Sequence, residues 1–148
     1  MPSPNRTREI AHYEAGHRSV KTVTSTGATL LSADSGKLVV VDTSGGDTTI
    51  TLPAAEPGLK FCFLVWKTAA AKDLHINSPA SAAYYKGGVS WRDIDATGAQ
   101  ALSESNGTSE YRLQMDDPDV GTTIEVVCDG TLWYIWGTVL DNAAPTWS

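Results

Sequence analysis

The chain has 148 residues, of which 19% are charged and 41% hydrophobic, and its formal net charge is −6. This length suits a single domain, and the acidic balance argues against a nucleic-acid partner, because phosphate binding requires a basic surface. No run of residues is long and apolar enough for a transmembrane helix, and the first twenty residues lack the apolar core of a signal peptide. We therefore expect a protein that is made in the cytosol and has no membrane partner.

Residues 1–26 are predicted to form a flexible arm rather than part of the folded domain. Pro2 and Pro4 oppose an early helix, and the apolar content that follows is too low to hold a helix without a partner. Residues 1–21 carry a net charge of +2, against −8 for the remainder. We predict that the arm docks on an acidic surface, although an ordinary polar terminus explains the same charges equally well. The basic candidates for this contact are Arg6, Arg8 and Arg18.

Residues 27–148 are predicted to form one all-β domain, because short strand-like runs alternate with turn signals along the whole segment. The expected architecture is an antiparallel β-sandwich or barrel, jelly-roll-like. Only residues 68–72 and 99–103 look helical, for one turn each, and no internal repeat is apparent. The expected strands are Ala28–Leu31, Lys37–Asp42, Thr48–Leu52, Lys60–Lys67, Leu74–Asn77, Tyr84–Lys86, Val89–Ile94, Tyr111–Met115, Thr122–Cys128 and Leu132–Val139.

The apolar pattern divides these strands into two kinds. Thr48–Leu52 and Leu74–Asn77 alternate between apolar and polar side chains, which predicts one solvated face. Leu38–Val41, Phe61–Trp66 and Leu132–Trp136 are apolar at consecutive positions, so both of their faces need cover. We favour a second subunit as that cover, because large exposed apolar patches usually mark interfaces. A loop layer is the alternative. The candidate interface residues are Trp66, Tyr134 and Trp136.

The clearest local prediction is a β-hairpin over Thr122–Val139. Asp129-Gly130 is a typical pair for a two-residue type I′ turn, in which both residues have positive φ. Ile124, Val126 and Cys128 are expected to share one face of the first strand.

Few side chains form a pattern typical of catalysis or metal binding, so we expect no enzyme activity, no cofactor and no metal. Cys62 and Cys128 lack the spacing of a zinc site and are expected to be buried free thiols, although a disulfide between them stays open. The turn holding Asp116, Asp117 and Asp119 offers three carboxylates for Ca²⁺, but capping of its own backbone explains them as well.

Exposed aromatic side chains raise sugar binding as a further alternative. The candidates are Trp91, Trp147 and the pair Tyr84-Tyr85, because aromatic rings stack on sugars. Aromatic residues in a β-sandwich are, however, more often part of the core or of an interface.

Three segments carry a resemblance to a known class of protein. They are Ser35-Gly36-Lys37 followed by an apolar strand, Thr49–Pro53 (TITLP), and the closing Asp129–Tyr134 (DGTLWY). In these features the chain resembles β-domains of bacteriophage virion proteins, namely capsid decoration (cement) proteins and head or tail fibres. The resemblance covers residues 28–140 in patches and carries over no functional residue.

The resemblance implies a structural protein of the virion, most often a homotrimer. Because the chain has no coiled-coil or collagen-like shaft, decoration is favoured over a fibre. The expected partners are further copies of the chain and the major capsid protein, which the arm would contact. The alternative is a fibre or knob domain that binds a host receptor or glycan.

Overall fold

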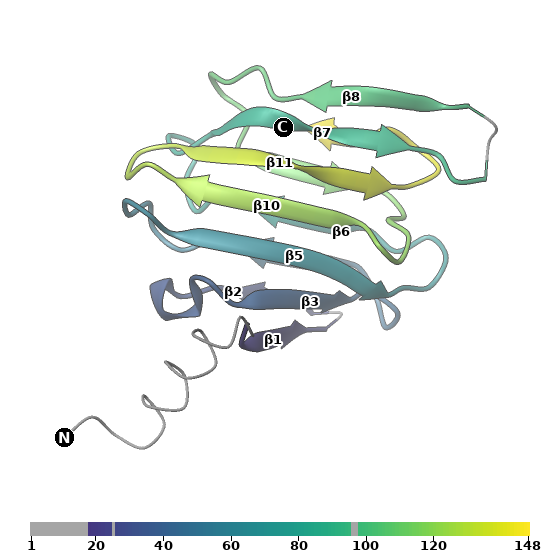
Figure 1. Ribbon diagram of the computed structural model, residues 1–148, viewed down its shortest axis with the longest axis horizontal. Coiled ribbons are helices and arrows are strands. Elements are labelled where there is room, and N and C mark those ends of the chain that lie inside the picture. Colours follow the sequence, from purple (N-terminus) through teal and green to yellow (C-terminus); the bar gives the residue numbers. More distant parts are fainter. Residues whose placement is uncertain (1–17, 25, 96–97) are drawn as a thin grey trace.

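The computed structural model describes residues 18–24, 26–95 and 98–148, which form two β-sheets packed face to face (Figure 1). The predicted all-β sandwich is therefore confirmed. A 3₁₀ turn, η1 (Ser32–Asp34), interrupts the strands. In spatial order, the larger sheet contains β1 (Val20–Val23), β3 (Leu38–Asp42), β5 (Lys60–Lys67), β10 (Thr123–Cys128), β11 (Trp133–Leu140), β7 (Tyr85–Arg92) and β8 (Gln100–Glu104). The smaller sheet contains β12 (Thr146–Trp147), β9 (Arg112–Met115), β6 (Leu74–Asn77), β4 (Thr48–Thr51) and β2 (Ala28–Thr29).

The strand pairing is mixed, whereas the sequence predicted antiparallel sheets. Five of the ten strand pairs that the structure describes are parallel. From β1 to β6 the chain changes sheet after every strand, so β1, β3 and β5 stack in one sheet and β2, β4 and β6 in the other. The arrows of β1, β3 and β5 point the same way in Figure 1. A chain that crosses to the other sheet and returns runs in its earlier direction, and this produces parallel neighbours.

One strand of each sheet forms one coil, so the coils are β1 with β2, β3 with β4, and β5 with β6. These three stacked coils give the first half of the chain the arrangement of a short β-solenoid. The second half closes the stack with antiparallel pairs: β10 lies against β5, and β9 lies against β6. A jelly roll is therefore not the topology. The structural repeat was not visible in the sequence, because its coils share strand positions but no residue motif.

Three local predictions also differ from the structure. Val20–Val23, assigned to the arm, forms the edge strand β1, which pairs in parallel with β3. Neither segment expected to be helical forms a helix: residues 68–72 lie in the loop after β5, and residues 100–103 lie in the edge strand β8. The strands expected at Tyr84–Lys86 and Val89–Ile94 form one continuous strand, β7, and Gly87 and Gly88 lie inside it. A Cβ on Gly87 would lie 2.4 Å from the carbonyl oxygen of Ile135, so these glycines permit close approach of neighbouring backbones.

The hairpin of β10 and β11 is confirmed, but the centre of its turn is shifted by one residue. The N–H of Asp129 donates to the carbonyl of Leu132 at 3.2 Å, which leaves Gly130 and Thr131 as the two central residues. Gly130 has φ of +106°, whereas Asp129 is not among the described residues with positive φ. The Asp129 carboxylate instead accepts hydrogen bonds from the N–H groups of Thr131 and Leu132, both at 2.8 Å. Its side chain therefore stabilises the turn from outside.

The core lies between the sheets and is richest in large side chains below β5, β7 and β11. Phe61 and Trp133 are fully buried, with ring centroids 6.1 Å apart. Tyr85 of the larger sheet is also fully buried, and its hydroxyl donates to the carbonyl of Ile76 in the smaller sheet at 3.1 Å. Burial raises the pKa of Tyr85 far above its usual value, so this phenol stays neutral.

A buried carboxylate holds the first coil to the stack. The Asp34 carboxylate accepts hydrogen bonds from the ammonium group of Lys21 in β1 at 2.8 Å, from that of Lys37 at 2.9 Å and from the Leu31 N–H at 3.1 Å. Burial alone would raise the pKa of Asp34, but the hydrogen bonds from Lys21 and Lys37 outweigh it and hold that pKa well below its usual value. Asp34 is therefore charged in the folded protein at neutral pH.

Candidate functional site

The outer face of the larger sheet carries an apolar patch with three exposed aromatic side chains. Trp66 is 52% exposed, Tyr134 41% and Trp136 44%. These are the residues that the sequence singled out as interface candidates, and all three lie on this one face. Partly or largely exposed apolar side chains of the neighbouring strands extend it. We call this surface the aromatic face; its apolar residues are Val20, Leu38, Val40, Cys62, Leu64, Trp66, Val127, Tyr134 and Trp136, and the charged residues Glu125 and Lys60 lie among them.

Cross-strand pairing holds the aromatic face in register. Glu125 of β10 lies opposite Cys62 on one side and Trp136 on the other. The indole Nε1 of Trp136 donates to the Glu125 carboxylate at 2.8 Å. Tyr134 donates its hydroxyl to Asp129 at 3.2 Å, and this hydrogen bond and the charge of Asp129 raise the pKa of Tyr134. The two aromatic rings of β11 are thus tied to neighbouring carboxylates and keep their positions.

The outer face of the smaller sheet is polar, which makes the two sides of the sandwich different. In β4 and β6 the inward residues Ile50 and Ile76 are fully buried. The alternation predicted for both strands is confirmed, and solvated side chains follow it into β9. Residues on this polar face include Thr29, Thr49, Thr51, His75, Asn77, Arg112, Gln114 and Thr146. A face of this composition is stable in water without a partner, whereas the aromatic face exposes apolar area to it.

Of the predicted arm contacts, the structure describes only Arg18; Arg6 and Arg8 lie outside the described residues. Arg18 is exposed and immediately precedes the residue whose carbonyl accepts from the Leu38 N–H. Its charge acts on the Cys62 thiol of the aromatic face. Burial and the Glu125 carboxylate raise the pKa of Cys62, while Arg18 opposes that rise.

Both cysteines are free, and the alternative of a disulfide is not realised. Cys128 is buried, as expected, but Cys62 is only half-buried because it belongs to the outer face of β5.

The loops at one end of the sandwich bring together much of the negative charge of the chain. They follow β3, β5, β7, β9 and β11, which all end at the right-hand side of Figure 1. Burial and the charges of Asp95, Asp117 and Asp93 raise the pKa of Asp119. Burial and the charges of Asp47, Asp116 and Asp117 likewise raise the pKa of Asp73, so these loops lie close enough to repel one another.

This acidic end accounts for the whole formal charge of −6. The six other described carboxylates are balanced by six described cations elsewhere on the domain. The aromatic face therefore lies outside the main concentration of charge. The acidic end contains Asp42, Asp47, Asp73, Asp93, Asp95, Asp116, Asp117, Asp119 and Asp141, with Lys67, Lys72 and Arg92 as its cations.

The turn of Asp116, Asp117 and Asp119 lies at this end, and its backbone N–H groups bind residues at the end of β11. The Asp117 N–H donates to the carboxylate of Asp141 at 3.4 Å, and the Asp119 N–H donates to the carbonyl of Leu140 at 2.7 Å. In the described part of the chain, no three or more His, Cys, Asp or Glu side chains are arranged to hold a metal ion. None of the helices described there has the length and apolar character to cross a membrane.

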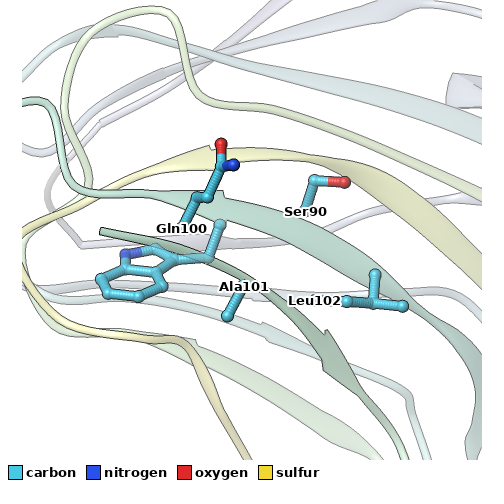
Figure 2. Close-up of a pocket in the computed structure, with 5 residues that line it drawn as sticks. Ser90, Gln100, Ala101 and Leu102 are labelled. Atoms are coloured by element: carbon cyan, nitrogen blue, oxygen red, sulfur yellow. The ribbon is translucent and has the colours of Figure 1, made fainter. Parts of the chain in front are cut away.

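A shallow pocket of about 350 Å³ lies between β7 and β8, at the edge of the larger sheet that is farthest from β1. Its lining is Ser90, Trp91, Gln100, Ala101 and Leu102. Figure 2 shows Gln100 and Ala101 extending to opposite sides of the edge strand. The Trp91 indole donates to the carbonyl of Asp141 at 2.9 Å and is half-buried against the core.

The other aromatic candidates for sugar binding are not part of this pocket. Tyr84 precedes β7, whereas Trp91 lies near its far end. Tyr85 is fully buried, and Trp147 packs on it with ring centroids 5.9 Å apart.

Comparison of the sequence with models of protein families and with curated proteins gives no match. The surfaces of the domain itself are therefore the guide to its function. Reasoning from the sequence named the three aromatic residues of the aromatic face but missed Glu125 at its centre. The pattern of β10 could have placed Glu125 on this face, because Glu125 alternates with the inward-facing Ile124 and Val126.

Proposed function

We propose that this protein is a self-associating structural subunit of a virion that decorates and stabilises a phage capsid as a homotrimer. The observation that carries the proposal is the contrast between the aromatic face and the polar face of the same sandwich. The virion role and the trimeric state come from the resemblance of Ser35-Gly36-Lys37, Thr49–Pro53 and Asp129–Tyr134 to phage virion β-domains.

The size of the aromatic face supports association between copies. An aromatic side chain buries about 150–250 Å², so the exposed fractions of Trp66, Tyr134 and Trp136 leave about 300 Å² of aromatic surface in water. A partner in a standard interface contributes about 800 Å². The three rings alone therefore supply more than a third of such an area, and the aliphatic members of the face add to it.

The charge distribution also favours an arrangement in which the aromatic faces of three copies meet around a threefold axis. Symmetry brings the charges of identical copies close together there, and like charges repel unless they are few or neutralised. The net charge of the chain lies in the loops of the acidic end and not on the aromatic face. When copies meet through this face, their acidic ends, which carry the like charges, lie at the periphery of the contact.

The role proposed for the arm is contact with the capsid shell through Arg6, Arg8 and Arg18. It is tested by deleting residues 2–17, which spares β1 because that strand begins at Val20. We expect the truncated protein to stay folded and oligomeric but to bind empty shells more weakly. The deletion removes Arg6 and Arg8 but keeps Arg18, so unchanged decoration by the truncated protein would exclude a shell contact through Arg6 and Arg8.

The proposal as a whole is tested by oligomeric state and by copy number. Light scattering on the purified protein should give three times the mass of the chain. Replacing both Trp66 and Trp136 with serine should weaken association at least 100-fold, because interface aromatics of this kind each contribute about 2 kcal/mol or more. Mass spectrometry of particles of the encoding phage should find hundreds of copies. Decoration is contradicted if the natural chain and the double variant are both monomeric. It is also contradicted if the particles contain a dozen copies or fewer.

The second candidate function is recognition of a host glycan by a fibre or knob domain, and the pocket between β7 and β8 favours it. The amide of Gln100 and the hydroxyl of Ser90 are suited to sugar hydroxyls, and exposed Leu102 offers an apolar contact. A glycan array comparing the natural chain with Gln100→Ala tests this function. Loss of a specific signal in the variant supports glycan binding, and the absence of any signal from the natural chain rules against it.

A further inference from the structure

The centre of the aromatic face holds a carboxylate that a partner subunit would cover. Glu125 is half-buried in the middle of β10, between Cys62 of β5 and Trp136 of β11. Its neighbour two residues along the same face is Val127, which lies opposite Tyr134. Any contact that buries Trp136 and Tyr134 therefore also removes Glu125 from water.

A buried carboxylate needs more hydrogen bonds than this one has from its own sheet. The Trp136 indole donates one, at 2.8 Å. An ionised carboxylate accepts about four hydrogen bonds, and its burial without a cation is strongly unfavourable. Association through this face consequently requires a positive group near Glu125.

Arg18 is placed to provide that group. The next residue, Ser19, accepts from the Leu38 N–H at 2.8 Å, which fixes the chain at the β1 edge of the face. Leu38 in turn lies opposite Cys62, and Cys62 lies opposite Glu125. The charges of Arg18 and Glu125 both act on the Cys62 thiol, with opposite effects on its pKa.

We infer that Arg18 is a specificity-determining residue of the association surface, and that its guanidinium neutralises Glu125 when a second copy covers the aromatic face. The inference rests on the self-association proposed above. It gives the base of the arm a role within the interface, separate from any contact with a shell. Arginine suits this position because its planar guanidinium pairs with carboxylates through two parallel hydrogen bonds and is weakly hydrated.

Lys60 is the matched control. It lies on the same face at the start of β5, opposite Val127 and diagonal to Glu125, and it is exposed. A lysine in this position remains hydrated at the margin of the sheet. Its replacement tests whether any cation on the face has the same effect as Arg18.

The experiment measures association constants by sedimentation equilibrium for the full-length natural chain and four variants. These are Arg18→Gln, Glu125→Gln, Arg18→Gln with Glu125→Gln, and Lys60→Gln. We expect Arg18→Gln to weaken association about 10- to 100-fold, because it leaves Glu125 unpaired. The double variant should recover to within about threefold of Glu125→Gln alone, and Lys60→Gln should stay within threefold of the natural chain. Urea unfolding of each variant verifies that the fold is retained.

The possible results separate this inference from the proposed function. If the natural chain associates but Arg18→Gln has no effect, or if the double variant shows no recovery, the inference is wrong and the self-association stands. If Lys60→Gln weakens association as much as Arg18→Gln, the neutralising role is not specific to Arg18 and the inference is again wrong. A natural chain that stays monomeric at all concentrations overturns the proposed function and this inference together.

Discussion

The ion pairs of Asp34 provide the sharpest test of how the first coil is held to the domain. The change is Asp34→Asn, which preserves the shape of the side chain and an acceptor for the Leu31 N–H. It removes two ion pairs, to Lys21 at 2.8 Å and to Lys37 at 2.9 Å. The Asp34 side chain is 7% exposed and each lysine side chain 30%, so these pairs are intermediate between surface and buried pairs.

The expected loss of stability follows from that intermediate burial. Surface pairs contribute about 0.2–1 kcal/mol, and breaking a buried pair costs about 3–5 kcal/mol. We expect about 1 kcal/mol for each pair of Asp34, and so about 2 kcal/mol lower free energy of unfolding at pH 7. With a urea slope of about 2 kcal/mol/M, the unfolding midpoint should fall by about 1 M.

The pH dependence gives an independent readout of the same interaction. Because the pKa of Asp34 is lowered in the folded state, its stabilisation is complete above the unfolded pKa of about 3.9 and is lost as the pH falls below it. The natural chain should therefore lose stability relative to Asp34→Asn between about pH 5 and pH 2. Glu104→Gln, an exposed position on β8, is the control. Equal stability of Asp34→Asn and the natural chain at pH 7, or parallel pH profiles, would refute this reasoning.

Two further stability predictions concern the core and the sheet backbone. Tyr85→Phe leaves the Ile76 carbonyl without its buried donor and should cost about 1–2 kcal/mol in urea unfolding, and an unchanged midpoint would contradict this bond. Gly87→Ala places a Cβ 2.4 Å from the Ile135 carbonyl oxygen and should cost more than about 3 kcal/mol. Gly98→Ala is its matched control, because Gly98 also has positive φ (+89°) but has open space around it. This variant should lower the free energy of unfolding by only about 1 kcal/mol. Equal losses in the two variants would rule out the close contact at Gly87.

Local pattern was sufficient for much of the strand content. Lys60–Lys67 and Leu74–Asn77 match the predicted bounds, because long apolar or alternating runs leave little choice of conformation. The edge strands were the hardest to predict. β1 and β8 contain few inward-facing apolar residues, so β1 resembles a polar arm and β8 a helical turn until the neighbouring strand supplies its hydrogen bonds.

The two-residue period of a strand was enough to show which side chains share a face. In Leu132–Trp136 the two-residue period groups Trp133 with Ile135 and Tyr134 with Trp136. It could not determine which pair points inward, because both are apolar. Only packing against the smaller sheet decided this, by burying Trp133 and Ile135 and leaving the other two exposed. The parallel stacking of β1, β3 and β5 was likewise decided by the tertiary structure, since strand direction depends on where the chain crosses between sheets and not on the pattern within a strand.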